Sequence, residues 1–239
     1  MASYFFDMKS ARPGTAEDSY AYANRTGRYS RSKETNDLVA SGHRNLPEGF
    51  DNDPMKFLAT GDRYERRNGA VVRKLILALP RELPLAEQEK LVVDFLDATA
   101  PCKPSGYAIH HPKQAAFGDD GNPHTHVWLC DRIPDGIPRE RAQFFRRAHP
   151  TVPELGGCRK DSGGKDPQQA KESMRNMRRA WADLQNLALE AGGHPDRVTH
   201  LSLREQKVDR KPEPRFGFMG VKRMDQGAKD EIRASRRTA

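Results

Sequence analysis

The sequence is short of long hydrophobic runs, which argues against a membrane-embedded protein. Its longest apolar stretches, such as residues 75–79, fall far below the roughly 20 residues that a spanning helix requires. Residues 1–14 include an acid and a lysine and no uninterrupted apolar segment, so they do not match a secretory signal. We therefore expect a cytoplasmic protein.

Cysteine is also scarce. The chain has 3 cysteines, Cys102, Cys130 and Cys158, at wide spacing and without a CxxC pair. An odd, widely spaced set does not suit a disulfide framework or a zinc knuckle, so we expect buried free thiols. A phosphate-binding P-loop is missing as well, and no nucleotide cofactor is expected.

Acidic residues are outnumbered by basic ones. The 33 Asp and Glu residues stand against 41 Lys and Arg residues, which gives a formal charge of +8. Such an excess favours a polyanionic partner. Because no apolar anchor for a membrane is visible, nucleic acid is the better candidate.

The pattern of residues indicates one mixed domain, since 239 residues can bury one core but are short for two. Periodicity and capping residues predict strands at 3–9, 70–79, 107–111 and 124–131, and helices at 15–25, 53–68, 85–99 and 166–191. Residues 30–53 are polar and predict a surface loop. Strands and helices mix without regular alternation, which favours an α+β fold with a central antiparallel β-sheet flanked by α-helices.

Two further predictions concern the C-terminal third. The helix at 166–191 has an apolar stripe that should pack on the core, made of Met174, Met177, Trp181, Leu184 and Leu187. After residue 205, charged residues, Pro and Gly dominate. We therefore expect a domain over 1–205 and a basic, partly disordered tail or linker at 206–239.

The most informative segment is GNPHTHVWLCDR, residues 121–132. Side chains alternate along a strand, so His124 and His126 point to one face, where they can bind the same cation. The short connection predicts that residues 107–111 pair with this strand as a hairpin. Either His110 or His111 would then share that face, and the sequence alone does not choose between them.

The density of histidine favours a metal site over histidines that merely bond to neighbouring side chains. Four of the 8 histidines lie within residues 110–126. Imidazole ligands favour a transition ion such as Mn²⁺ or Zn²⁺, although an open site that faces a phosphate also accepts Mg²⁺. We expect a divalent metal without choosing among the three.

A basic protein with such a site suits metal-assisted attack on a phosphodiester, which needs water or a side chain as the nucleophile. The N-terminal segment offers Tyr20, Tyr22 and Tyr29 among arginines. Taken alone, these tyrosines are better explained as ordinary residues with packed rings and wetted hydroxyls.

Five segments resemble, in the same order, the N-terminal relaxase domain of MobA/MobL mobilization proteins. They are AYANRTGRYSR (21–31), YERRNGAVVRKLILALPREL (64–83), AIH (108–110), NPHTHVWLCDRIPDGIPR (122–139) and AWADLQNLALEAGG (180–193). The resemblance covers residues 2–205 and implies an antiparallel sheet with an HUH-type histidine site. It also implies a bacterial endonuclease that nicks one strand at the nic site of an origin of transfer through a 5′-phosphotyrosyl link, in conjugative mobilization of plasmid DNA.

Carried over by position, the resemblance assigns the metal site to three histidines, His110, His124 and His126. It assigns the nucleophile to Tyr22, which precedes the GRY motif at 27–29 as the family's tyrosine does. Tyr29 matches a second tyrosine that contacts DNA or packs. Glu65 matches an acidic position that would orient a metal-bound histidine or accept a proton, and the alternative is a solvent-facing helix residue.

The resemblance also implies partners. Residues expected to follow the DNA backbone are Arg25, Arg28, Tyr29 and Arg31. The expected partners are origin-of-transfer DNA, single-stranded near nic, with relaxosome accessory proteins and a type IV secretion coupling protein. Family members often carry further C-terminal regions that nothing in this sequence resembles. Two rival functions stay open: a water-using metal-dependent phosphoesterase, and a non-catalytic DNA-binding accessory protein.

Overall fold

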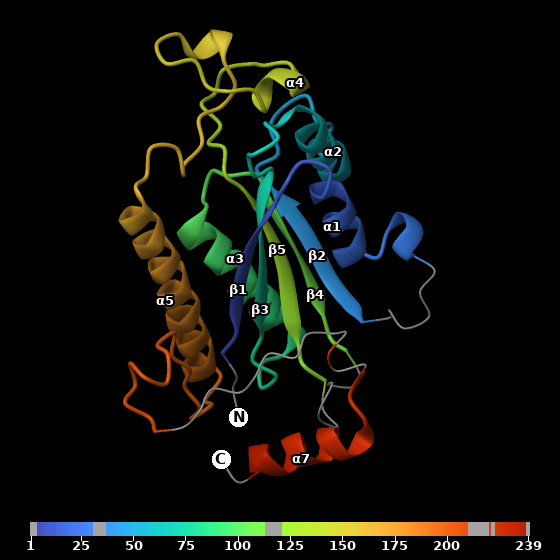
Figure 1. The fold of residues 1–239 in the computed structure, drawn as a ribbon, viewed down its shortest axis with the longest axis vertical. Helices are drawn as coiled ribbons and strands as arrows, with labels where there is room; N and C mark the ends of the chain where they lie inside the picture. The colour runs from blue at the N-terminus through green and yellow to red at the C-terminus, as the bar shows by residue number, and fades with distance from the viewer. Residues whose placement is uncertain (1–3, 31–36, 113–120, 210–219, 221–222, 238–239) are drawn as a thin grey trace.

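The computed structural model describes residues 4–30, 37–112, 121–209, 220 and 223–237. At its centre lies a 5-stranded antiparallel sheet in the order β1-β3-β5-β4-β2 (Figure 1). The strands are β1 (Phe6–Ala11), β2 (Leu38–Arg44), β3 (Val72–Ala78), β4 (Ser105–His110) and β5 (His124–Cys130). The expected α+β fold is confirmed.

Helices cover both faces of the sheet (Figure 1). One face carries α1 (Ala16–Ala23), α2 (Pro54–Tyr64) and α4 (Arg141–Phe144), and the other carries α3 (Leu85–Thr99) and α5 (Pro167–Ala191). Further helical segments are the 3-10 turns Gly27–Tyr29 and Pro153–Leu155, and α7 (Gln226–Arg237). Within the described ranges, no helix is long and apolar enough to cross a membrane.

The face under α3 and α5 holds the larger apolar core. Leu75, Leu77 and Ile109 of the sheet are buried there with Phe95 of α3 and Trp181 of α5. The rings of Phe95 and Trp181 meet edge to face with centroids 5.2 Å apart. Because apolar packing covers most of this face, a site for a polar substrate is expected on the opposite face.

Helix α5 begins where its capping residues predict. The Asp166 carboxylate accepts a hydrogen bond from the Gln169 amide, and the Gln169 side chain accepts one from the Asp166 amide. The predicted stripe packs on the core except at Leu187, which is 63% exposed. Leu187 lies about 90° around the helix from the centre of the stripe, because each residue advances by about 100°.

Helix α1, which carries two of the candidate tyrosines, is anchored by α2. Thr15 occupies the N-cap position as predicted, but its side chain makes no capping hydrogen bond. Instead, Asp62 of α2 accepts hydrogen bonds from the amides of Ala16 at 3.0 Å and Glu17 at 2.9 Å. A carboxylate at a helix N-terminus satisfies free N–H groups and complements the helix dipole. A tertiary contact therefore positions α1.

The prediction of a loop throughout residues 30–53 is wrong, because β2 lies within it. In the described sheet β2 is an edge strand paired with β4. Its sequence, LVASGHR, has weak β-propensity and no clear alternation of apolar and polar residues. Pairing with β4, rather than local preference, decides its conformation.

Two smaller predictions concern the cysteines and the tail. Cys130 and Cys158 are buried free thiols as expected, whereas Cys102 is free and exposed. Beyond residue 205 the described residues include α7, which lies at the end of the molecule away from α2 and α4 (Figure 1). The boundary at 205 stays a prediction.

Candidate active site

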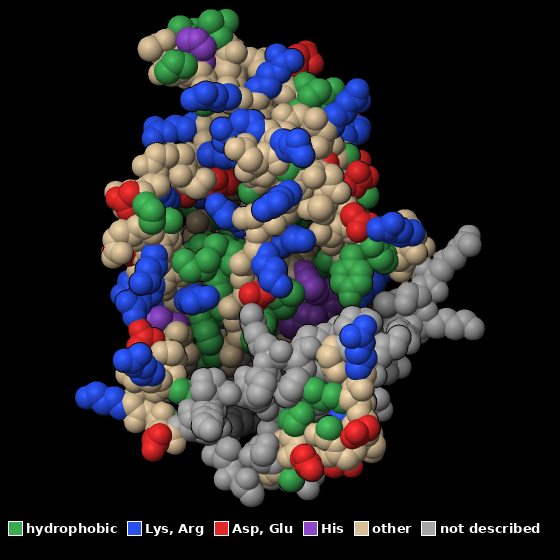
Figure 2. All heavy atoms as spheres, in the orientation of Figure 1, with side chains coloured by type: hydrophobic (Ala, Val, Ile, Leu, Met, Phe, Trp, Pro, Cys, Tyr) green, Lys and Arg blue, Asp and Glu red, His purple; other side chains and the backbone are tan. Residues whose placement is uncertain are grey.

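The hairpin register brings three histidines together on the α1 face of the sheet. His110 of β4 pairs with His124 of β5, and His126 lies two residues further along the same face. Ring centroids are 5.4 Å apart for His110 and His124, 5.1 Å for His110 and His126, and 5.2 Å for His124 and His126. Figure 2 shows histidine side chains gathered in a hollow of this face. The three predicted ligands form one cluster.

The structure also separates His110 from His111. The Nε2 atom of His111 lies 2.6 Å from Oε1 of Gln88 on α3. The Gln88 amide in turn donates to the carbonyls of Pro80 at 2.8 Å and Leu83 at 3.1 Å. His111 is therefore part of the α3 packing, and His110 belongs to the cluster.

Burial favours the neutral form of all three imidazoles. It lowers the pKa of His110 and His124, and together with the neighbouring histidines it lowers the pKa of His126 to about 3. Nδ1 of His124 lies 2.8 Å from the Asn122 carbonyl oxygen, and Nδ1 of His110 lies 3.2 Å from Oδ1 of Asp37. Nη2 of Arg25 also lies 3.3 Å from Nδ1 of His110. In the tautomer that donates from Nδ1 to these oxygens, the Nε2 lone pair is free.

This donor set fits a metal ion chemically. Neutral imidazoles whose Nδ1 atoms donate to oxygen are typical metal ligands through Nε2. Nε2 of His110 is buried and has no hydrogen-bond partner among the residues described, so an ion would satisfy it. The same residues include no three His, Cys, Asp or Glu side chains already arranged to hold an ion. Joint ligation by the cluster would therefore require the rings to rotate.

Asp37, which the sequence analysis missed, holds the cluster from the side of β2. Besides its contact with His110, it accepts hydrogen bonds from Arg25 on both carboxylate oxygens at 3.0–3.2 Å. Burial raises the pKa of Asp37, but the hydrogen bonds from His110 and Arg25 outweigh this effect and lower it overall. An ionised Asp37 thus fixes the orientation of the His110 ring. No sequence signal marked it, because it lies in the segment predicted as a loop.

Arg25 connects Asp37 to the end of α1. Its left-handed backbone, with a φ of 53°, turns the chain back over the last turn of the helix. The guanidinium carbon lies 4.8 Å from the ring centroid of Tyr22, and Nη1 donates to the Tyr22 carbonyl at 2.7 Å. The Arg25 side chain is only 13% exposed. The structure therefore places Arg25 in an internal ion pair rather than at the free surface position expected of a phosphate contact.

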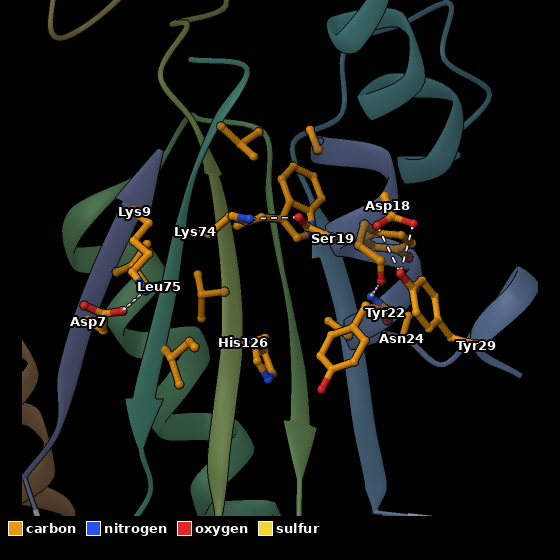
Figure 3. A pocket seen from close by; sticks show the side chains of 17 residues that line it. Asp7, Lys9, Asp18, Ser19, Tyr22, Asn24, Tyr29, Lys74, Leu75 and His126 are labelled. Atoms are coloured by element: carbon orange, nitrogen blue, oxygen red, sulfur yellow. Dashed lines mark hydrogen bonds and ion pairs between the residues drawn. The ribbon is translucent and has the colours of Figure 1, made fainter. Parts of the chain in front are cut away.

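Tyr22 is the tyrosine that lies beside the histidines. Its ring centroid is 6.3 Å from that of His126, and its side chain is 49% exposed. Figure 3 shows the ring next to His126, with the hydroxyl pointing away from α1. No residue in the described ranges forms a hydrogen bond with that hydroxyl. Among the described residues, Tyr22 therefore lies near the cluster and has no hydrogen bond at its oxygen.

The other two tyrosines make different contacts, although the Tyr29 ring packs edge to face on that of Tyr22 with centroids 5.3 Å apart. Tyr20 packs edge to face on Trp128 with ring centroids 6.3 Å apart, and burial raises its pKa. The Tyr29 hydroxyl donates to Oδ2 of Asp18 at 3.0 Å and accepts from Nη2 of Arg28 at 2.9 Å. The Tyr20 ring is therefore packed against β5, and the Tyr29 hydroxyl is held by two side chains.

Glu65 lies away from the histidines. Its buried carboxylate contacts Nη2 of Arg132 at 2.7 Å and Nζ of Lys160 at 3.0 Å. Arg132 follows the end of β5 opposite to His124. The expectation that Glu65 orients a metal-bound histidine is thus not met in this structure, because the side chain neutralises two cations elsewhere.

The remaining predicted DNA contacts lie near the tyrosines or beyond the described residues. Arg28 is 71% exposed and pairs with Asp18 at 2.5 Å. Arg31 lies outside the described residues, so its placement stays a prediction.

A cleft of about 400 Å³ opens between α1 and the neighbouring strands (Figure 3). We call it the α1 cleft. Its polar lining includes Lys9, Asp18, Ser19, Tyr22, Lys74 and His126. It therefore leads from the candidate nucleophile to a pair of lysines on β1 and β3.

The model of the MobA/MobL family matches residues 15–226. The chain belongs to the MobA/MobL family. The matched range includes α1, the histidine hairpin and α5. Both parts of the candidate site therefore lie inside the family region.

Curated relatives of this MobA/MobL chain carry related names. It is 37% identical over 211 residues to the 43 kDa relaxation protein of Salmonella typhimurium, covering 88% of this chain and 56% of that protein. It is 34% identical over 222 residues to mobilization protein A of Escherichia coli, covering 91% and 30% respectively. The mobilization protein MobL of Acidithiobacillus ferridurans is 27% identical over 198 residues, covering 72% and 48%. The chain thus spans about half of these relatives or less.

A solved structure shows the same fold. It comes from work on the molecular basis of vancomycin resistance transfer in Staphylococcus aureus, and the TM-score is 0.60. The match covers 84% of this MobA/MobL chain and 100% of the solved chain at 21% sequence identity. The likeness supports the architecture of sheet and helices.

Proposed function

We propose that this MobA/MobL chain is a relaxase that nicks one strand of plasmid DNA at an origin of transfer. The observation that carries the proposal is the position of Tyr22, whose ring lies 6.3 Å from that of His126. Its hydroxyl makes no hydrogen bond with the described residues and would serve as the nucleophile beside three neutral imidazoles. The names of the relatives, relaxation protein and mobilization protein, support plasmid DNA as the substrate.

In the proposed reaction, the Tyr22 oxygen attacks the scissile phosphorus, and the bond from phosphorus to the 3′ oxygen breaks. The products are a 5′-phosphotyrosyl bond and a strand that ends in a 3′-hydroxyl. The tyrosine proton passes to solvent, and the leaving 3′ oxygen takes up a proton. Because the phosphotyrosyl bond conserves the energy of the broken link, the reverse attack reseals the strand without a nucleotide cofactor.

His110, His124 and His126 would hold a divalent cation, Mn²⁺, Mg²⁺ or Zn²⁺. When bound, the ion would neutralise negative charge on the scissile phosphate and favour ionisation of the attacking tyrosine. Asp37 acts indirectly by holding the His110 ring. Arg25 contacts both Asp37 and Tyr22, so it would keep the nucleophile aligned with the histidines.

The substrate and partners follow from the same proposal. We expect single-stranded origin DNA near nic to bind on the face shown in Figure 2, where Lys and Arg side chains gather around the histidine hollow. Exposed Arg28 beside Tyr29 supports contact with the DNA backbone at this place. Relaxosome accessory proteins and a type IV secretion coupling protein would act with the chain in the bacterial cytoplasm.

The proposal is tested on supercoiled plasmid that carries the protein's own origin, with and without Mn²⁺ or Mg²⁺. We expect metal-dependent nicked circles and, after protease treatment, DNA with a linked peptide. Tyr22→Phe removes the attacking oxygen but keeps the ring, so adduct formation should fall by about 10³-fold or more. Tyr20→Phe and Tyr29→Phe are matched controls and should retain activity.

Other outcomes would favour other functions. Nicking without adduct that survives in all three Phe variants would favour a water-using phosphoesterase. Origin binding without metal-dependent cleavage would favour a non-catalytic accessory protein. An adduct that mass spectrometry maps to Tyr20 or Tyr29 would move the nucleophile and preserve the mechanism.

A further inference from the structure

We propose that Lys74, assisted by Lys9, binds a DNA backbone phosphate next to the scissile one, inside the α1 cleft. The ligand class is a phosphodiester of a single strand. This inference rests on the proposed nicking function and deepens it by naming a substrate contact.

The register of the sheet places Lys74 close to the candidate site. Lys74 of β3 pairs with Lys9 of β1 and with Trp128 of β5, while Ile76 pairs with His126. Lys74 therefore lies one strand over from His126 and two residues along, or about 7 Å along the strand direction. All three side chains that matter here, Lys74, Tyr22 and His126, border the same cleft (Figure 3).

This separation suits an extended nucleic-acid strand. A scissile phosphate held between Tyr22 and His126 has neighbouring phosphates one nucleotide away in each direction. The α1 cleft extends from His126 toward Lys74, so a strand that follows it brings one neighbouring phosphate to the lysines. The lining of the cleft includes Asp7 and Asp18 and also the cations Lys9 and Lys74, which would meet the next phosphate of the strand.

Lys74 is a partly buried cation that lacks a carboxylate partner. Its Nζ donates to Oγ of Ser19 at 2.8 Å, and it forms no ion pair with an acid in the described part of the chain. Burial lowers the pKa of Lys74 and the charge of Lys9 lowers it further, whereas Asp18 and Asp62 act in the opposite direction. A partly buried ammonium beside a second cation is unfavourable unless an anion accompanies it.

Several other lysines in the described part of the chain differ from Lys74 in this respect. Carboxylates contact Lys56, Lys90, Lys103 and Lys160. Lys9 is 73% exposed and lies 3.4 Å from Asp7, so its charge is largely solvated. Lys74 is therefore the stronger candidate for direct contact, and Lys9 adds a longer-range attraction.

The test uses Tyr22→Phe protein, so that binding is measured without cleavage, and a single-stranded oligonucleotide that spans the mapped nick. One phosphate at a time is replaced by an uncharged methylphosphonate. We expect one position beside the scissile phosphate at which this replacement weakens binding about tenfold. Lys74→Met should weaken binding of the unmodified oligonucleotide by a similar factor and abolish the sensitivity at that one position.

Two control variants distinguish a specific contact of Lys74 with one phosphate from a general effect of positive charge on DNA binding. Lys90→Met removes an exposed lysine on α3, on the opposite face of the sheet, and should leave every sensitivity unchanged. Lys74→Arg keeps the charge and should keep the sensitive position. If circular dichroism shows that Lys74→Met is unfolded, Lys74→Gln replaces it in the same measurement.

The inference is overturned if folded Lys74→Met or Lys74→Gln binds as tightly as the parent, or keeps the parent's full pattern of sensitivities. Failure of the proposed function looks different, because protein with an intact Tyr22 would then form no adduct with origin DNA. If the adduct forms normally but substitution of Lys74 does not change the effect of any methylphosphonate, only the proposed phosphate site is rejected and the nicking function stands.

Discussion

Two ion-pair networks lie at opposite ends of β5, and they differ in the other groups that their members contact. Near the C-terminal end of β5, the Glu65 carboxylate pairs with Arg132 and Lys160. Near the N-terminal end of β5, the Asp37 carboxylate pairs with Arg25 and contacts His110. In both networks a carboxylate joins distant parts of the chain.

The Glu65 network is closed, in the sense that its members bond to other groups of the protein. The Arg132 guanidinium also donates to three backbone carbonyls, those of Arg146 at 2.7 Å, Cys158 at 2.6 Å and Phe145. The Arg132 and Glu65 side chains are 2% and 0% exposed. Apart from a 3.8 Å contact of Glu65 with the exposed Arg66, these partners lie inside the protein, so this network stabilises the fold.

The Asp37 network is open, in the sense that it ends at two side chains that a ligand could contact. On one side it reaches His110, whose Nε2 has no partner among the described residues, and on the other it reaches the half-exposed Tyr22 through Arg25. Asp37 is less buried than Glu65, at 15% exposure. A functional acid is therefore recognised by the groups that its partners contact rather than by its own burial.

The largest effect is expected from breaking the closed network. Arg132→Met leaves Glu65 buried with one cation fewer and three carbonyls without their donor. The free energy of unfolding should fall by about 3–5 kcal/mol, measured by urea denaturation. Arg175→Met, in the exposed pair with Glu205, is the matched control and should cost less than about 1 kcal/mol. Equal losses in the two variants would contradict the distinction between the networks.

An intermediate effect is expected from the open network. Asp37→Asn keeps the shape but removes the charge that holds His110, so metal affinity by calorimetry and the nicking rate should both fall about 10–100-fold. The loss of stability should be smaller than for Arg132→Met. Glu65→Gln is the counterpart: it should destabilise the fold while folded protein binds metal normally. Unchanged metal affinity in Asp37→Asn would show that both networks only stabilise the fold.

The smallest effect concerns pH, because the open network adjoins titratable imidazoles. The pKa of His126 is about 3 in the folded protein and about 6.5 in an unfolded chain, so between these values the unfolded state binds more protons. Without metal, stability should therefore fall as pH drops from about 6 to about 4, with a contribution from His126 of about 1 kcal/mol per pH unit. His126→Gln should reduce this slope. An unchanged slope would mean that His126 is accessible to protons in the folded state.

The sequence by itself determined the features that depend on neighbouring residues. His124 and His126 share a face because side chains alternate along any strand. Helix α5 begins at Pro167 because Asp166 and Gln169 form a capping box within a single turn. Tyr22 was assigned through the spacing of a family motif, and the structure places it beside His126.

Only the tertiary structure decided which distant groups meet. The pairing of β4 with β5 places His110, and not His111, beside His124 and His126. The pairing of β2 with β4 brings Asp37, from a segment predicted as a loop, to His110. The same long-range packing placed Glu65 against Arg132. Strand register depends on which faces of the whole sheet are buried, and local sequence holds little information about that choice.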